Sequence, residues 1–164
     1  METTWLLITL SLLPVKDWSR DVTEEITVTY HQTLNECRND AIKSDQRFEN
    51  YLKERGMKEK YDDTVRDAGI VEMAICWNGK DAQMVYPKTI DAPWLAVVAR
   101  FTPISYVDKR SGRREKVGYG IARVGRFRSL PECRKGLANA SNELARELKP
   151  QEEKAVFCVS TGRG

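Results

Sequence analysis

The 164-residue chain has little of what most catalytic and metal-binding sites use. It contains one histidine, His31, and no two of its four cysteines are separated by only two residues. Catalytic schemes that need two imidazoles are therefore excluded, and no metal site is expected. The glycines at 118 and 120 lack the third glycine and the lysine of a phosphate loop, so no nucleotide cofactor is expected either.

The chain also lacks an apolar run long enough to cross a bilayer, so no transmembrane span is expected. Its longest apolar run is Trp5–Leu13, and charged residues follow from Lys16. The length of this run suits the core of a secretory signal, although Glu2 stands where a basic residue is typical and no small-residue cleavage motif follows. We therefore expect residues 1–18 to be a signal peptide or an apolar N-terminal segment, ahead of a single domain over residues 19–164.

What the chain does contain is a globular composition with an uneven charge distribution. Apolar residues make up 41% of it and charged residues 31%, which excludes wholesale disorder. The net charge is only +3, but residues 109–135 carry ten basic and two acidic side chains. Residues 1–108 carry thirteen basic and eighteen acidic side chains, so the first part of the chain is acidic and the following segment is basic.

Two six-residue stretches, Thr33–Arg38 and Ser129–Arg134, resemble each other. Each opens with a Ser/Thr-x-x-Glu capping box, and at an offset of 96 the apolar positions of the two following helices coincide. A short apolar stretch with a second cysteine follows each helix and is typical of a buried strand. The sequence therefore predicts an internal helix–strand repeat with pseudo-repeats over residues 26–77 and 117–160.

The four cysteines allow three pairings, and the repeat favours Cys37 with Cys76 and Cys133 with Cys158. Two such disulfides would imply an oxidising compartment, so we expect a secreted or periplasmic protein. The alternative is a cytoplasmic protein with four reduced thiols.

These patterns predict an α+β fold. We expect an antiparallel sheet of about five strands with two helices packed on one face, in the order strand, helix, strand, long hairpin, helix, strand. Residues 53–67 are rich in charge and are expected to be a solvated helix end and loop. The arrangement resembles a ferredoxin-like sandwich, an analogy of fold alone that carries no function.

A basic hairpin over residues 109–128 is the sharpest functional feature, with Ser111-Gly112 at its apex. Tyr106, Tyr119 and Phe127 lie among its charges. Such a ribbon suits an acidic protein or an anionic envelope surface, or a nucleic acid whose phosphates it would follow. Alternatively, its charges only keep a sheet edge from pairing with another sheet. The candidate binding residues are Lys109, Arg110, Arg113, Arg114, Lys116, Arg123, Arg126 and Arg128.

A second candidate surface lies between residues 77 and 94. Asn78-Gly79 predicts a turn, and a loop with large apolar side chains is expected after it. Trp77, Tyr86 and Trp94 are its candidate binding residues. Alternatively, these side chains fold back to cover a sheet edge.

The leading hypothesis is a small disulfide-stabilised extracytoplasmic domain that binds another macromolecule without catalysis of its own. The first alternative is a cytosolic nucleic-acid-binding protein that uses the basic hairpin. The second is an enzyme with a carboxylate or tyrosine site, because such sites often have no local signature in sequence.

Overall fold

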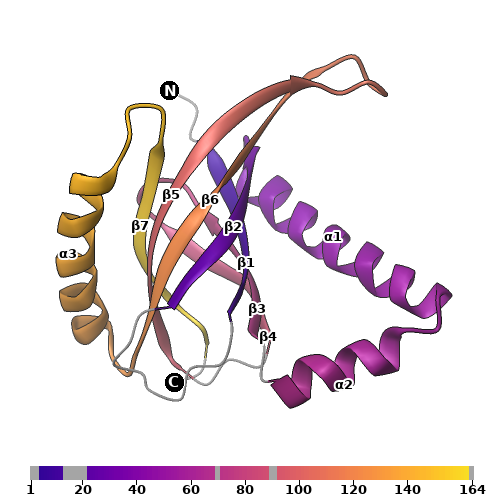
Figure 1. Cartoon of the computed structure of the whole chain (residues 1–164), viewed down its shortest axis with the longest axis horizontal. Coiled ribbons are helices and arrows are strands. Elements are labelled where there is room, and N and C mark those ends of the chain that lie inside the picture. The colour runs from indigo at the N-terminus through magenta and orange to yellow at the C-terminus, as the bar shows by residue number, and fades with distance from the viewer. Residues whose placement is uncertain (1–3, 13–21, 69–70, 89–91, 163–164) are drawn as a thin grey trace.

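The computed structural model describes residues 4–12, 22–68, 71–88 and 92–162, and within them seven strands and three helices follow one another (Figure 1). The strands are β1 (Trp5–Leu12), β2 (Val22–His31), β3 (Val71–Trp77), β4 (Ala82–Lys88), β5 (Trp94–Val107), β6 (Arg114–Phe127) and β7 (Glu153–Ser160). The helices are α1 (Leu34–Glu54), α2 (Lys58–Ala68) and α3 (Leu130–Glu147).

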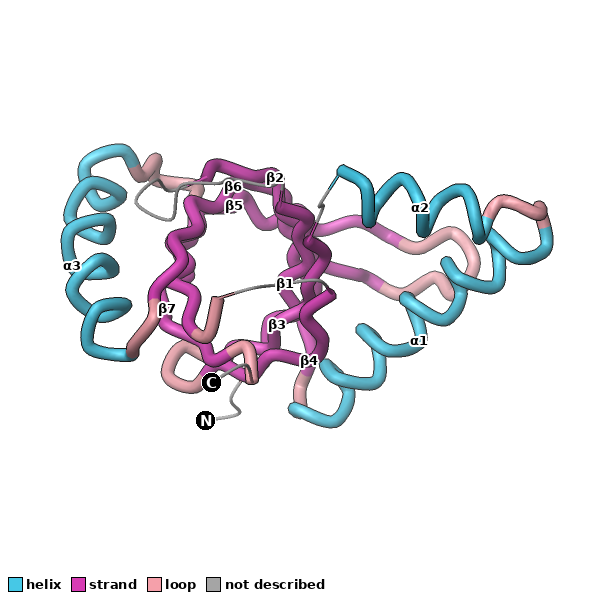
Figure 2. The backbone as a smooth tube through the Cα atoms, turned by 90° about the horizontal axis from the view of Figure 1, so that it is seen from below, coloured by secondary structure: helices cyan, strands magenta, loops and turns pink. Residues whose placement is uncertain are grey.

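All seven strands belong to one antiparallel sheet in the order β4-β3-β1-β2-β6-β5-β7. The sheet curls into a half-barrel, and its two edge strands, β4 and β7, approach one another (Figure 2). The helix pair α1–α2 lies on one side of the curled sheet and α3 on the other. Curling in this way encloses one face of the sheet, which becomes the core.

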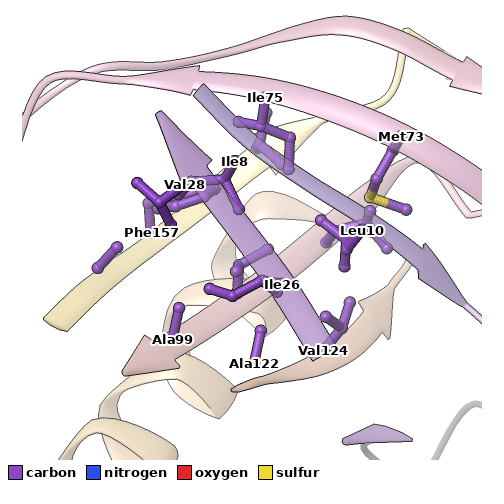
Figure 3. Close-up of a cluster of buried hydrophobic side chains, with 14 of the residues drawn as sticks. Ile8, Leu10, Ile26, Val28, Met73, Ile75, Ala99, Ala122, Val124 and Phe157 are labelled. Atoms are coloured by element: carbon purple, nitrogen blue, oxygen red, sulfur yellow. The ribbon is translucent and has the colours of Figure 1, made fainter. Parts of the chain in front are cut away.

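Alternate residues of the strands fill this interior (Figure 3). Ile8 of β1, Val28 of β2 and Ile75 of β3 have no exposed surface, and Phe157 of β7 stacks on Trp77 across the closing side. Since successive strand residues point to opposite faces, the remaining positions point outward toward helices or solvent. The two helices with buried residues, α1 and α3, therefore pack on the outside of the curl.

Both packed helices begin as their sequences predict. The side chains of Thr33 and Ser129 accept hydrogen bonds from the amides of Glu36 and Glu132, at 3.1 and 3.3 Å. These bonds satisfy amides that the first turn of a helix leaves without a partner. The caps fix the points at which β2 passes into α1 and β6 passes into α3.

The predicted fold class is wrong in its details. The sheet has seven strands instead of about five, there are three helices instead of two, and the curled half-barrel replaces the ferredoxin-like sandwich. One missed strand, β4, lies in a stretch with a proline and a turn. The missed helix, α2, has no buried residue, and its sequence is mostly charged, a composition that favoured a solvated segment over a packed helix.

Residues 5–12 of the apolar run form β1, which pairs with β2 on one side and β3 on the other. Leu6, Ile8 and Leu10 point into the interior and are buried, while Leu7 is buried on the outer face beneath α1. Cleavage as a signal peptide, which stays an untested prediction, would remove this central strand. The rest of the predicted segment apart from Thr4, residues 1–3 and 13–18, lies outside the described residues.

The two halves of the sheet have matching registers. In each half a hairpin is followed by a helix and a strand, and the first strand of the hairpin pairs with both other strands. The matched pairs are Trp5–His31 with Trp94–Phe127, and Leu7–Cys76 with Ala96–Cys158. The pseudo-repeats stay a prediction, which these registers support.

Gly120 of β6 provides a test of strand packing. A Cβ atom at this position would lie 2.0 Å from the backbone oxygen of Arg100 and 2.6 Å from the Cα of Phe101. We expect Gly120→Ala to lower the free energy of unfolding by about 3 kcal/mol or more. The new methyl group would clash with backbone atoms, which cannot move away by a change of side-chain rotamer. Urea denaturation measures this loss.

Gly118→Ala is the matched control, because its nearest obstacles are the side chains of Phe101 and Val28 at 2.9 and 3.1 Å. Side chains can shift, so a smaller loss is expected. Equal losses for the two variants would contradict the packing described for Gly120.

Candidate binding surface

The hairpin of β5 and β6 extends beyond its neighbours in the sheet. Strand β7 pairs with β5 only as far as Phe101, and β2 pairs with β6 only from Val117 onward. Residues 102–116 therefore pair with no strand outside the hairpin and project from the half-barrel on the same side as α1 and α2 (Figures 1 and 2). We call this segment the arm. A lone two-stranded ribbon is marginal in water, so it is a natural element to be covered by a partner.

The tip of the arm is a defined turn. The carboxylate of Asp108 accepts hydrogen bonds from the amide of Arg110 at 3.0 Å and from the hydroxyl of Ser111 at 3.2 Å. The amide of Gly112 donates to the Asp108 carbonyl at 2.8 Å, and Gly112 has φ = +69°, which favours glycine. The turn therefore holds its flanking basic residues in a fixed arrangement.

Four cations surround this turn: Lys109, Arg110, Arg113 and Arg114. All four are exposed. None of the ion pairs found in the described parts of the chain involves any of them. The four cations outnumber the one carboxylate of this turn, that of Asp108, so they form a net positive charge at the end of a projecting element.

The other four predicted basic residues lie closer to the body. The Nζ atom of Lys116 lies 4.4 Å from the ring centroid of Tyr30, a cation–π contact. The guanidinium of Arg123 donates to a carboxylate oxygen of Glu143 on α3, at 2.5 Å. Arg126 is buried, whereas Arg128 is exposed just beyond β6. The predicted set thus divides into a cationic tip and residues that contact the body of the domain.

The arm also has an apolar outer face. Ile104 pairs with Val117 in the hairpin, and the exposed fractions of Ile104, Tyr106 and Tyr119 are 45%, 49% and 55%. The two tyrosines were predicted from their place near the basic residues, whereas Ile104 was not predicted. Ile104 and Tyr106 on the arm, with Tyr119 at its base, present exposed side chains of a size that marks an interaction surface.

An open groove lies on the outer face of the sheet below the arm. It has a volume of about 1140 Å³, and β1, β2, β3, β4 and β6 line it. Tyr119, at the base of the arm, contributes to its lining. Sequence reasoning missed this groove because its residues come from strands far apart in the chain. The hydroxyl-bearing residues in its lining, tyrosines aside, are Thr9, Ser11, Thr23 and Thr27.

A carboxylate and two tyrosines meet between α2 and the sheet. The hydroxyl of Tyr61 donates a hydrogen bond to Glu72, and this bond ties α2 to β3. Burial, followed by that hydrogen bond, raises the pKa of Tyr61. Burial and the charges of Asp45 and Glu72 raise the pKa of Tyr86 to about 12. Both phenols therefore stay protonated at neutral pH, where they can donate hydrogen bonds but cannot act as general bases.

The predicted aromatic surface is distributed over three strands. Trp77 packs against the interior cluster, and Tyr86 packs on the outer face near Cys37. Trp94 begins β5 and is half-buried. The turn between β3 and β4 forms at Asn78, as predicted, with Gly79 at φ = +94°. The use of the three aromatics for binding stays a prediction, and their half-buried positions leave the arm as the more exposed surface.

Two disulfides join helices to strands, Cys37–Cys76 between α1 and β3 and Cys133–Cys158 between α3 and β7. These are the pairs that the repeat favoured. They indicate an oxidising compartment. No helix in the described ranges is long and apolar enough to cross a membrane.

The fold and its two disulfides thus define a small disulfide-stabilised α+β domain with a projecting basic arm. Comparisons with protein families, curated proteins and solved structures found no match.

Proposed function

We propose that this protein is an extracytoplasmic binding domain, secreted or periplasmic, that uses its arm to bind an acidic protein surface. The observation that carries this proposal is the arm itself, with four exposed cations around an ordered turn and an apolar face beside them. Positive charge steers an acidic partner toward the tip, and the apolar face provides surface that becomes buried when the partner binds.

Charge distribution favours an acidic protein over a nucleic acid. Five of the ten basic side chains of residues 109–135 lie within residues 109–116, at or beside the tip, whereas residues 1–108 are acidic overall, with thirteen basic and eighteen acidic side chains. A long phosphate backbone that continued past the tip would meet this acidic body and be repelled. An acidic protein can present a local patch that meets the tip alone.

Nucleic acid binding is the second candidate, because the exposed Tyr106 lies on the arm and the exposed Tyr119 lies at its base. Exposed tyrosines beside arginines can stack on bases while the arginines contact phosphates. The two candidates differ in their preferred probe and in the dependence of affinity on salt.

Reversing the tip charge with Arg113→Glu and Arg114→Glu is expected to weaken the binding of a labelled polyglutamate about ten- to a hundredfold at low salt. Attraction becomes repulsion at two positions, while both side chains are exposed and contribute no buried contact. Fluorescence anisotropy measures the affinity, and circular dichroism is expected to give an unchanged melting temperature.

Arg134→Glu with Lys135→Glu is the matched control, since it makes the same change in net charge at exposed positions on α3. It is expected to leave most of the affinity intact. If both double variants bind polyglutamate as wild type does, the arm is not the binding surface. A duplex DNA oligonucleotide that binds more tightly than polyglutamate, with a steep salt dependence, would instead favour the nucleic-acid candidate.

A further inference from the structure

A small pocket lies at the end of the half-barrel from which the arm projects. Side chains of β1, β2, β3, β6 and β7 line it, and its volume is about 290 Å³. The mouth of a β-barrel is a frequent place for a ligand site, and small-molecule pockets begin at about 300 Å³. The pocket therefore suits a small molecule better than a segment of a macromolecule.

The side chains around this pocket come from the interior face of the sheet. Tyr30 and Trp77 pack against the interior cluster, and the Nζ atom of Lys116 lies 4.4 Å from the ring centroid of Tyr30. Glu153 is two residues before Ala155 of that cluster, so it lies on the same face of β7. The curl of the sheet thus brings an ammonium, a carboxylate, a phenol and an indole to one mouth.

The two charged groups of the pocket are of opposite sign. Lys116 and Glu153 are both exposed, and neither takes part in an ion pair found in the described ranges. Since they do not neutralise one another by direct contact, each can pair with a charge on a ligand. A ligand that carries both an anionic and a cationic group would satisfy both.

The hydroxyl of Tyr30 is buried and has no hydrogen-bond partner among the residues that the structure describes. Burial, followed by the negative charge of Glu153, raises the pKa of Tyr30 to about 12, so the phenol stays protonated at neutral pH and can donate. Leaving a buried donor without an acceptor is unfavourable. The hydroxyl therefore favours a ligand that brings an acceptor oxygen to the side of the pocket where Lys116 lies.

We propose that this pocket binds a small zwitterion, an apolar amino acid, at the mouth of the half-barrel. The carboxylate of the ligand pairs with the ammonium of Lys116, draws it off the ring of Tyr30 and accepts a hydrogen bond from the phenol. The ammonium of the ligand pairs with Glu153, and its apolar side chain packs on Trp77 and Leu6. The site goes beyond the proposed function, because it uses none of the four cations at the tip of the arm.

Isothermal titration calorimetry of the full disulfide-bonded chain with L-leucine, L-methionine and L-phenylalanine tests the proposal. At least one of them is expected to bind with a dissociation constant of about 1 mM or lower, as a ligand of this size can reach. Phenylalaninamide lacks the carboxylate and hydrocinnamic acid lacks the ammonium, so each is expected to bind at least about tenfold more weakly than L-phenylalanine. Absence of binding by all three amino acids would overturn the proposal, as would equal affinity for the two analogues and L-phenylalanine.

Neutral substitutions of the two charged groups make the test specific to this pocket. Lys116→Gln and Glu153→Gln are each expected to weaken binding about tenfold. Glu115→Gln and Lys154→Gln are the matched controls, because each removes a charge at an exposed neighbouring position on the opposite face of the same strand. Wild-type affinity in both pocket variants, or an equal loss in the controls, would place the ligand elsewhere.

Tyr30→Phe separates a binding role of the hydroxyl from a structural one. It is expected to weaken binding about three- to tenfold and to leave the melting temperature unchanged or higher, because the hydroxyl it removes has no partner in the described chain. Tyr119→Phe removes the same atom from an exposed ring outside the pocket and is expected to change neither quantity. Unchanged affinity in Tyr30→Phe, or a lower melting temperature, would overturn the assignment of its hydroxyl to the ligand.

Discussion

Removal of residues 1–12 is expected to abolish the folded state. These residues include β1, which lies between β2 and β3 near the centre of the sheet. Without it, two strands lose a partner and the interior loses Leu6, Ile8 and Leu10, a loss comparable to the total stability of about 5–15 kcal/mol typical of a domain. The far-ultraviolet circular dichroism of the truncated chain is expected to show no cooperative thermal transition.

A single substitution in the full-length chain tests the packing of β1 without shortening the chain. Ile8 has no exposed surface, so Ile8→Ala is expected to lower the free energy of unfolding by about 2–5 kcal/mol. Ser11→Ala, at an exposed position of the same strand, is expected to change it by less than about 0.5 kcal/mol.

Intact-mass analysis of the natively expressed protein adds a second check. A folded mature chain that begins after residue 18 would contradict the role assigned to β1.

Loss of either disulfide is expected to have the next largest effect. The cysteines of Cys37–Cys76 are 39 residues apart and those of Cys133–Cys158 are 25 apart. In the chain-entropy model, loops of these lengths contribute about 3.9 and about 3.5 kcal/mol, respectively, by restricting the unfolded chain. Replacing both cysteines of one pair by alanine is expected to lower the free energy of unfolding by about that amount in urea denaturation.

The two pairs join different helices to different strands, so their losses are expected to add. Reductant applied to wild type serves as the matched condition, because it removes both links without altering the sequence. If reductant leaves the unfolding midpoint of wild type unchanged, the disulfides do not support the fold, and the argument for an oxidising compartment fails with them.

Sequence reasoning succeeded where a local pattern has one structural meaning. The capping boxes at Thr33 and Ser129 begin helices, the Asn78-Gly79 turn joins two strands, and the glycine of the Ser111-Gly112 apex adopts positive φ. In each case the side chain or the missing Cβ acts on its own backbone, so distant residues are not needed to interpret it.

The strands and helix that sequence reasoning missed depend on distant contacts. Residues 5–8 are apolar at every position because Ile8 fills the interior while Leu7 packs beneath α1. These residues obscure the alternation that begins at Ile8 with Thr9, Leu10 and Ser11, and the whole run is the same length as a signal core. In the same way, α2 depends on contacts with other elements, a hydrogen bond from Tyr61 to Glu72 of β3 and an edge-on contact of the Tyr61 ring with Phe48 of α1.

The groove on the outer face of the sheet could not have been predicted from the sequence. Its glutamates come from β2 and β3, and its tyrosines come from β4 and β6. Only the pairing order of the sheet brings these strands side by side. The basic arm could be predicted, because its charges are consecutive in the chain, but its projection could not. That projection follows from where β7 and β2 stop pairing with the hairpin.

Hydrogen–deuterium exchange of the full chain, with and without saturating polyglutamate, tests most directly whether the arm is the binding surface. The account predicts slower amide exchange across residues 102–116 in the presence of polyglutamate, with little change in α3 or in the interior strands. Unchanged exchange in the arm, with protection appearing elsewhere in the domain, would contradict it.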